Sequence, residues 1–125
     1  MSEGGERFRL PRTARITASE EIRALFRRGK RKKTRHLDVF VSSSPVAYSR
    51  VGIVVPRHRQ KVVRRNLLKR RLREIARTLL LPRLNASGTS LDLLVRARPE
   101  AYTTDFQELR DQLVKATEEI CSSDR

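Results

Sequence analysis

The 125-residue chain has one cysteine, one methionine, no tryptophan, and only 14 acidic residues against 29 lysines and arginines. A single thiol, Cys121, excludes an internal disulfide and a zinc site built from several cysteines. No apolar run approaches the roughly 20 residues of a membrane span, and the N-terminal MSEGGERFRLPR lacks the apolar segment of a signal peptide. We therefore expect a cytoplasmic protein. The two histidines, His36 and His58, are too few and too isolated for a histidine-based metal site.

Sequence signatures of common catalytic sites are also missing. The chain has no Gly-rich phosphate loop, no Gly-x-Ser-x-Gly elbow and no Cys/His pair. The acids that could be gathered around two magnesium ions share no spacing: Glu20, Glu21, Asp38, Glu74 and Asp92. We expect no metal or cofactor bound by the polypeptide itself, and we predict that the chain binds a partner without catalysing a reaction.

What the chain has in excess is positive charge, with a net charge of +15. Such a basic protein usually meets a polyanion or an anionic membrane. The charge is concentrated, because residues 27–35 hold seven cations and residues 57–77 hold ten beside one acid, Glu74. These two segments therefore carry 17 of the 29 cations in 30 residues.

The segment VVRRNLLKRRLREIAR, residues 62–77, has the pattern of a two-sided helix. On a helical wheel its apolar residues fall within about 60° of one another, and a polar row takes the opposite side. The apolar row is Leu68, Leu72, Ile75 and Leu79, and the polar row is Asn66, Arg70, Arg73 and Arg77. We expect the first row to pack against a sheet and the second to face a partner.

The cations of this helix lack the oppositely charged neighbours that a solvated helix face normally has. Glu and Lys four residues apart stabilise a helix by about 0.2–0.5 kcal/mol, and like charges cost a similar amount. Arg65, Lys69 and Arg73 stand four residues apart without an acid between them, so an anion from outside must relieve the repulsion. The arginine bias favours phosphate, and because the leucine row is needed for the core, we prefer nucleic acid to a membrane. No other helix is predicted within a short turn before the basic helix, and this argues against a helix-turn-helix DNA-binding motif.

Other patterns predict an α+β domain that spans residues 1–125, with an ordered core at about 9–120 and flexible ends. A helix over about 18–28 would begin with a capping box, Thr17 and Glu20, and the final helix with another, Thr104 and Gln107. Period-two alternation predicts a strand in HLDVFVSS, and LDLLVRA predicts another strand at 91–97. RVGIVV, at 50–55, is apolar on both faces, which predicts a central strand.

Part of the basic helix resembles a known signature. Arg65, Asn66, Lys69, Arg70 and Arg73 resemble the Arg-Asn-x-x-Lys-Arg-x-x-Arg motif of the protein subunit of bacterial ribonuclease P. The segments RLPRTARITASEEIRALFRRGKR, SRVGIVVPRH and LDLLVRARPEAYTTDFQELRDQL resemble the opening, the strand before the signature helix and the closing part of that family. The resemblance runs from about residue 9 to residue 120 in the expected order.

The resemblance implies a two-layer α/β sandwich of order αβββαβα, with a left-handed βαβ crossover through the basic helix. It also implies an accessory subunit without an active site of its own, which joins a catalytic RNA in a 1:1 complex. Magnesium held by that RNA would serve the endonucleolytic removal of the 5′ leader from precursor tRNA. The protein would contact the catalytic RNA and grip the leader in a cleft between the signature helix and the sheet.

The resemblance also implies roles for particular residues. Contacts to RNA would come from Arg57, Lys61, Arg64, Arg65, Asn66, Lys69, Arg70, Arg73 and Arg77. The leader cleft would use Ile22, Phe26 and Phe40. Apart from the resemblance, the run of cations at residues 27–35 predicts a secondary basic patch of Arg28, Lys30, Arg31, Lys32, Lys33 and Arg35. The chain departs from the family where Ile22 replaces an aromatic residue, where Leu67 replaces an arginine, and where Gln60 and Lys61 replace Gly-Asn.

Two other classes of function stay open at the level of sequence. A structural RNA-binding protein, such as a ribosome-associated factor, would carry a similar basic helix without a role in cleavage. A protein-only nuclease would need clustered acids, and the spacing of the acids speaks against it.

Overall fold

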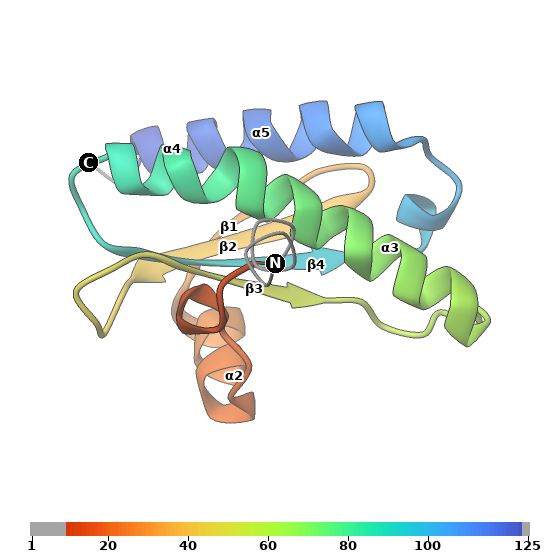
Figure 1. Cartoon of the computed structure of the whole chain (residues 1–125), viewed down its shortest axis with the longest axis horizontal. Helices are drawn as coiled ribbons and strands as arrows, with labels where there is room; N and C mark the ends of the chain where they lie inside the picture. Colours follow the sequence, from red (N-terminus) through yellow and green to blue (C-terminus); the bar gives the residue numbers. More distant parts are fainter. Residues whose placement is uncertain (1–9, 124–125) are drawn as a thin grey trace, which may run out of the picture.

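The computed structural model describes residues 10–123, in which a four-stranded sheet lies between helices (Figure 1). The elements in chain order are η1 (Arg12–Ala14), α2 (Ser19–Arg28), β1 (Lys30–Lys33), β2 (Leu37–Ser43), β3 (Arg50–Val54), α3 (Val62–Ile75), η2 (Ala76–Leu80), α4 (Leu81–Ala86), β4 (Leu91–Ala97), η3 (Pro99–Tyr102) and α5 (Phe106–Ser123). When α3, η2 and α4 are counted as one continuous helical connection, the α-helices and strands follow the order αβββαβα. The flexible ends that the sequence predicts fall mostly on residues 1–9 and 124–125, which lie outside this description.

The strands are arranged in the order β1-β2-β4-β3. β2 pairs antiparallel with β1 and with β4, whereas β3 and β4 are parallel neighbours. Parallel neighbours need a crossover connection, and here it is made by α3, η2 and α4. The βαβ unit through the basic helix is thus present, and its left-handedness stays a prediction.

The two faces of the sheet are covered unequally (Figure 1). α3, α4 and α5 lie over one face, and α2, alone among the α-helices of residues 10–123, lies on the other. Side chains alternate along β2, so Val39 joins the larger core beneath α3 and α5, while Phe40 joins a smaller cluster under α2. The larger core includes the fully buried Leu37, Leu72, Ile75, Leu80, Leu93, Leu109 and Leu113.

β1 is a strand that the hydrophobic pattern did not predict. Its four residues, Lys30–Lys33, are all cations and pair with Val41–Asp38 of β2. Lysine has a low strand preference, so the sequence gives no periodic signal. Lysines on an edge strand also discourage pairing with another chain, which makes this composition suitable for the outer position.

The central position predicted for the strand at 50–55 is wrong, because β3 lies at the edge of the sheet. The backbone N–H of Ile16 donates to the carbonyl of Val51 at 3.0 Å, so the segment before α2 covers part of this edge. A Cβ on Gly52 would come within 3.1 Å of Ile16 Cβ and 2.8 Å of Leu94. β3 is apolar on both faces because this segment packs closely over it.

The basic helix changes its period after Ile75. Residues 76–80 form a π-helical turn, which inserts extra residues into the helical repeat and rotates the following side chains. Leu80 is therefore fully buried, while Leu79, predicted for the core row, is only partly buried. Leu68, Leu72 and Ile75 are buried as predicted.

Neither predicted capping box forms. The N-cap of α2 is Ala18, without a side-chain hydrogen bond, and Thr17 lies before it. At α5, the carboxylate of Asp105 accepts a hydrogen bond from the backbone N–H of Glu108 at 2.8 Å. Asp105 is a strong N-cap residue and takes the role predicted for Thr104. Within residues 10–123, no helix combines the length and the apolar character needed to cross a membrane.

Candidate nucleic-acid interface

The exposed side of α3 lines a hollow of about 520 Å³. Arg77, the last residue of the predicted polar row, lies in η2 and is not among the residues that line it. Asn66, Arg70 and Arg73 are exposed and Lys69 is half-buried. The side chains of these four form no hydrogen bond or ion pair with other residues in the part of the chain that the structure describes. The hollow is lined by Leu10, Arg15, Asn66, Lys69, Arg70, Arg73 and Glu74. We call the four α3 residues the signature face.

The electrostatics of the signature face show the repulsion that the sequence implies. The pKa of Lys69 is lowered by partial burial and then by the neighbouring charges of Arg65 and Arg73. The one acid of the helix, Glu74, is already paired with Arg77. A phosphate at this surface would therefore relieve an unfavourable interaction between cations.

Three other cations predicted for the RNA contact have partners within the protein. Arg65 Nε donates to the carbonyl of Val55 at 2.8 Å, and Arg64 Nη2 donates to the carbonyl of Tyr102 at 3.0 Å. Arg77 pairs with Glu74. Arg64 and Arg65 thus tie the start of α3 to the end of β3 and to η3, in addition to any contact with a partner.

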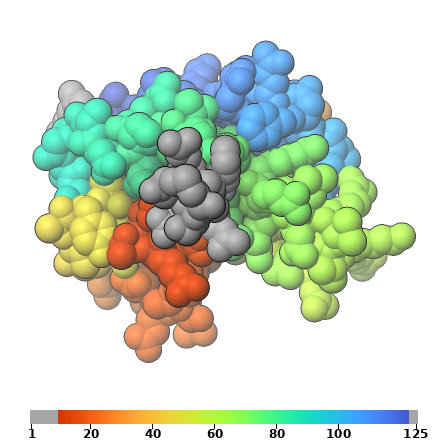
Figure 2. All heavy atoms as spheres, in the orientation of Figure 1, coloured from red at the N-terminus to blue at the C-terminus, as the bar shows by residue number. Residues whose placement is uncertain are grey.

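Arg57 and Lys61 lie in the loop that leads into α3. Arg57 is exposed, its carbonyl accepts a hydrogen bond from the N–H of Gln60 at 2.8 Å, and Lys61 is the N-cap residue of the helix. His58 and Arg59 have positive φ angles of 46° and 62°. Gln60 and Lys61, which replace Gly-Asn, thus directly follow two non-glycine residues with left-handed backbone. Figure 2 shows this yellow-green part of the chain projecting at one end of the molecule.

The three residues predicted for the leader cleft lie together, but on the face of the sheet opposite α3. Phe26 and Phe40 meet edge to face with ring centroids 5.0 Å apart, and Ile22 packs against the same cluster. The expectation of a cleft between the signature helix and the sheet is wrong, because Leu68 and Leu72 fill that space. Phe40 is 3% exposed and supports the half-buried Phe26 from the sheet.

The secondary basic patch is divided by the alternation of β1. Arg31 and Lys33 line a hollow of about 370 Å³ on the α2 side of the sheet, near the aromatic pair. Lys32 points to the other face, where its Nζ lies 3.7 Å from Glu119 Oε1. Arg28 ends α2, and Arg35 lies exposed in the β1–β2 turn. These residues therefore do not form one surface.

Two arginines on this side of the sheet were not predicted from the sequence. Arg96 and Arg98 line the same hollow as Arg31, and both approach the buried carboxylate of Asp38. The signal was the alternation in LDLLVRA, which places Arg96 on the face of β4 opposite Val95. We call Arg31, Lys33, Arg96 and Arg98 the sheet-face cations.

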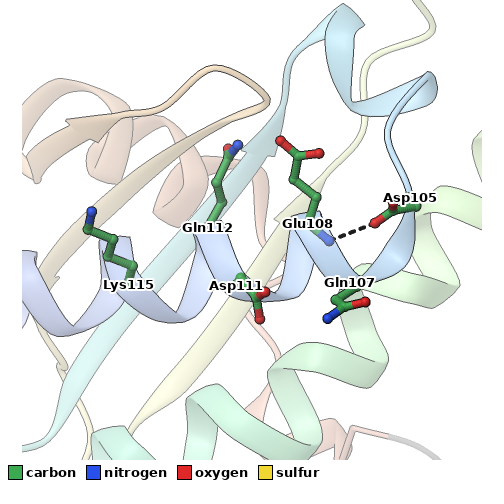
Figure 3. Close-up of a pocket in the computed structure, with 6 residues that line it drawn as sticks. All are labelled: Asp105, Gln107, Glu108, Asp111, Gln112 and Lys115. Carbon is green, nitrogen blue, oxygen red and sulfur yellow. Dashed lines mark hydrogen bonds between the residues drawn. The ribbon is translucent and has the colours of Figure 1, made fainter.

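The outer side of α5 is acidic, unlike the signature face and the sheet-face cations. Figure 3 shows the shallow hollow on this helix, with the bond from Glu108 N–H to Asp105 as a dashed line. The residues that line it are Asp105, Gln107, Glu108, Asp111, Gln112 and Lys115. The three acids among these residues would repel a phosphate backbone.

The two histidines of the described chain contact different residues. Among residues 10–123, no three His, Cys, Asp or Glu side chains are grouped to hold a metal ion. His36 is buried and its Nδ1 lies 2.7 Å from Gln112 Nε2, whereas His58 Nε2 lies 3.3 Å from the carbonyl of Ala97. Both imidazoles therefore make contacts that support the fold.

Comparison with curated proteins gives a consistent set of relatives. The chain is 49% identical over 78 residues to the ribonuclease P protein component of Thermus thermophilus, a match that covers 62% of this chain but only 44% of the relative. It is 39% identical over 115 residues to the protein component of Thermus brockianus, a match that covers 90% of this chain and 67% of the relative. It is 38% identical over 100 residues to that of Kocuria rhizophila, covering 80% and 85%. The match therefore spans less than half the length of the Thermus thermophilus protein.

Solved structures agree with these relatives. The ribonuclease P protein of Thermotoga maritima superposes with a TM-score of 0.69 at 29% identity, covering 84% of this chain and 96% of that chain. The protein of Staphylococcus aureus superposes at 0.70 with 21% identity, covering 84% and 93%, which supports the fold. The model of the family described as ribonuclease P matches residues 10–121. The chain belongs to the ribonuclease P family.

Proposed function

We propose that this chain is the protein subunit of ribonuclease P, bound 1:1 to a catalytic RNA in the cytoplasm. The signature face binds the RNA subunit, and the α2 side of the sheet binds the 5′ leader of precursor tRNA. The complex removes the leader endonucleolytically and leaves the mature 5′ end. The observation that carries this proposal is the signature face itself, four polar and cationic side chains with no partner among the described residues, in a member of this family.

The α2 side of the sheet suits an unpaired strand of RNA. Aromatic rings in a basic groove stack bases without a sequence requirement, at about 1–3 kcal/mol per base. Phe26 offers its half-buried ring there, with Phe40 beneath it and Ile22 beside it. Arg31 and Arg96 lie over the rings, and the four sheet-face cations line one hollow and would supply charge for the backbone. Because Ile22 is aliphatic, stacking rests mainly on Phe26.

The chemistry of cleavage is assigned to the RNA. Magnesium prefers free carboxylate oxygens, but Asp38 and Asp92 are buried against arginines, and Glu21 and Glu74 are also ion-paired. These donors do not fit a magnesium site on the protein. The protein contributes by neutralising phosphate charge at the RNA surface and by orienting the leader, which lowers the magnesium concentration that cleavage requires.

The test is reconstitution of the full chain with the ribonuclease P RNA of the same organism. Single-turnover cleavage of precursor tRNA is measured at low magnesium, with and without the protein. We expect faster cleavage with the protein and a mature 5′-phosphate end. Equal rates would contradict the proposal, and co-sedimentation with ribosomal subunits instead would support a structural RNA-binding protein. Cleavage by the protein without RNA would indicate a protein nuclease.

A further inference from the structure

A buried carboxylate organises the sheet-face cations. Asp38 of β2, with a side chain 3% exposed, lies in register between Lys33 of β1 and Arg96 of β4. Arg96 Nη2 donates to Asp38 Oδ2 at 2.8 Å. Arg31 Nη2 and Arg98 Nη1 lie 3.3 Å and 3.6 Å from Asp38 Oδ1. One carboxylate therefore gathers three guanidinium groups from β1, β4 and the start of η3.

The resulting cluster carries excess positive charge toward solvent. Three arginines meet one acid, and Lys33 lines the same hollow. The side chains of Arg31, Arg96 and Arg98 remain 48%, 35% and 27% exposed, while the carboxylate beneath them is shielded. An incoming anion would thus meet the arginines and not the acid.

Arg96 is fixed from a second side by the aromatic pair. Its guanidinium carbon lies 5.0 Å from the ring centroid of Phe26 and 5.6 Å from that of Phe40. That of Arg31 lies 5.7 Å from the ring of Phe40. A guanidinium held between a carboxylate and two rings has few orientations left, and its remaining N–H groups can meet phosphate oxygens with little further loss of entropy.

We propose that Asp38 is a positioning residue for single-stranded RNA. It holds Arg96, with Arg31 and Arg98, as a subsite for one backbone phosphate beside the base that stacks on Phe26. This inference rests on the proposed function, because the leader is the single strand concerned. It assigns the specificity for leader-bearing RNA to a buried acid that touches no RNA itself.

A surface that binds RNA by charge alone and a surface in which Asp38 positions Arg96 predict opposite changes of RNA affinity for the substitution Asp38→Asn. Asp38→Asn keeps the size of the side chain and removes a negative charge, so a purely electrostatic surface would bind RNA more tightly. If Asp38 positions Arg96, the same change frees the guanidinium and weakens binding of the leader. The loss of one charge-assisted contact corresponds to roughly a tenfold loss of affinity.

The experiment uses the reconstituted holoenzyme and two RNAs, a precursor tRNA with a leader of several nucleotides and the mature tRNA. We expect Asp38→Asn to reduce affinity for the precursor about tenfold and to leave affinity for mature tRNA unchanged. Unchanged or tighter binding of the precursor would overturn the inference. If the wild-type holoenzyme itself does not distinguish the two RNAs, the proposed function of the leader site fails instead.

A second variant separates positioning from folding. Arg96→Lys keeps the charge and a partner for Asp38 but lacks the planar fork, so it should also lose precursor affinity. The double variant should lose no more than either single variant, because both remove the same contact. Additive losses would overturn the inference. Thermal unfolding of each variant checks that the chain is folded. If Asp38→Asn does not fold, unchanged precursor affinity in a folded Arg96→Lys variant would still overturn the inference, because the subsite requires the guanidinium of Arg96.

Discussion

At the scale of single residues, the arginines of the basic helix differ in what their guanidinium groups touch. Arg70 is exposed and its side chain has no partner among the described residues, whereas Arg65 donates to the carbonyl of Val55. The sequence places both in one motif with the same spacing. The difference depends on where the end of β3 lies relative to α3, which spacing along the chain does not reveal.

This difference predicts separable effects on binding and stability. Arg70→Ala should weaken binding to the RNA subunit and change the free energy of unfolding by less than about 0.5 kcal/mol. Arg65→Ala should weaken binding and also destabilise the protein by about 1 kcal/mol, because a hydrogen bond to the backbone is lost. Denaturant unfolding and RNA titration of both variants measure this. Equal stability losses would contradict the assignment.

Asp38 predicts a pH dependence of stability. Burial raises its pKa, but the hydrogen bonds and charges of Arg96 and Arg31 outweigh burial, and the pKa is lowered overall. A pKa that is lower in the folded chain means that the ionised carboxylate stabilises the fold above the unfolded pKa of about 4. This contribution disappears as the pH falls through the folded pKa.

Denaturant unfolding between about pH 2.5 and pH 6 tests this linkage. Wild type should lose stability as the pH falls below about 4, and Asp38→Asn should be less stable at neutral pH with a shallower pH profile. Parallel profiles for the two proteins would mean that Asp38 is not linked to folding. The alternation in HLDVFVSS predicts that Asp38 and Phe40 share a face, but the pairing with Arg96 requires the register of β2 on β4.

At the scale of elements, the hydrophobic period correctly predicted the helix, but a constant step along it did not predict which leucine is buried after Ile75. The leucine row correctly identified a two-sided helix, and Leu68, Leu72 and Ile75 are buried. The turn at 76–80 is π-helical, so a wheel with a constant 100° step assigns Leu79 to the core in place of Leu80. β1 was missed for a different reason, since its residues carry no apolar alternation at all.

The π-helical turn predicts unequal costs for two neighbouring leucines. Leu80→Ala removes a fully buried side chain and should destabilise the protein by about 2–5 kcal/mol. Leu79→Ala removes a partly buried one and should cost clearly less. Chemical denaturation of the two variants compares them directly. The reverse order would show that the helix continues in a regular α-helical phase.

The start of α5 gives a similar comparison. Asp105→Ala removes the acceptor for the N–H of Glu108 and should cost about 1 kcal/mol of unfolding free energy. Thr104→Ala removes only an exposed hydrogen bond to the Glu108 carboxylate and should have a smaller effect. Similar values for both would argue that Asp105 does not cap the helix.

At the scale of the whole molecule, charge is distributed by face. The signature face and the sheet-face cations lie on opposite sides of the sheet, and α5 presents acids on its outer side. The sequence predicted the first of these basic surfaces. It placed Ile22, Phe26 and Phe40 between the signature helix and the sheet, whereas they lie on the opposite face, because a pattern does not show which face of the sheet each helix covers. Under the proposed function, these two separate basic surfaces would each hold one RNA.

The most direct test of this account is the salt dependence of affinity for the catalytic RNA alone. Lys69, Arg70 and Arg73 are replaced by alanine together, and a control of equal charge replaces Arg23, Arg27 and Lys115, which are exposed away from the signature face. Each lost phosphate contact should reduce the slope of log affinity against log salt by roughly 0.7–0.9. We predict a slope lower by about 2 for the signature variant and an unchanged slope for the control. Equal slopes for the two variants would contradict the central claim that the signature face binds the RNA.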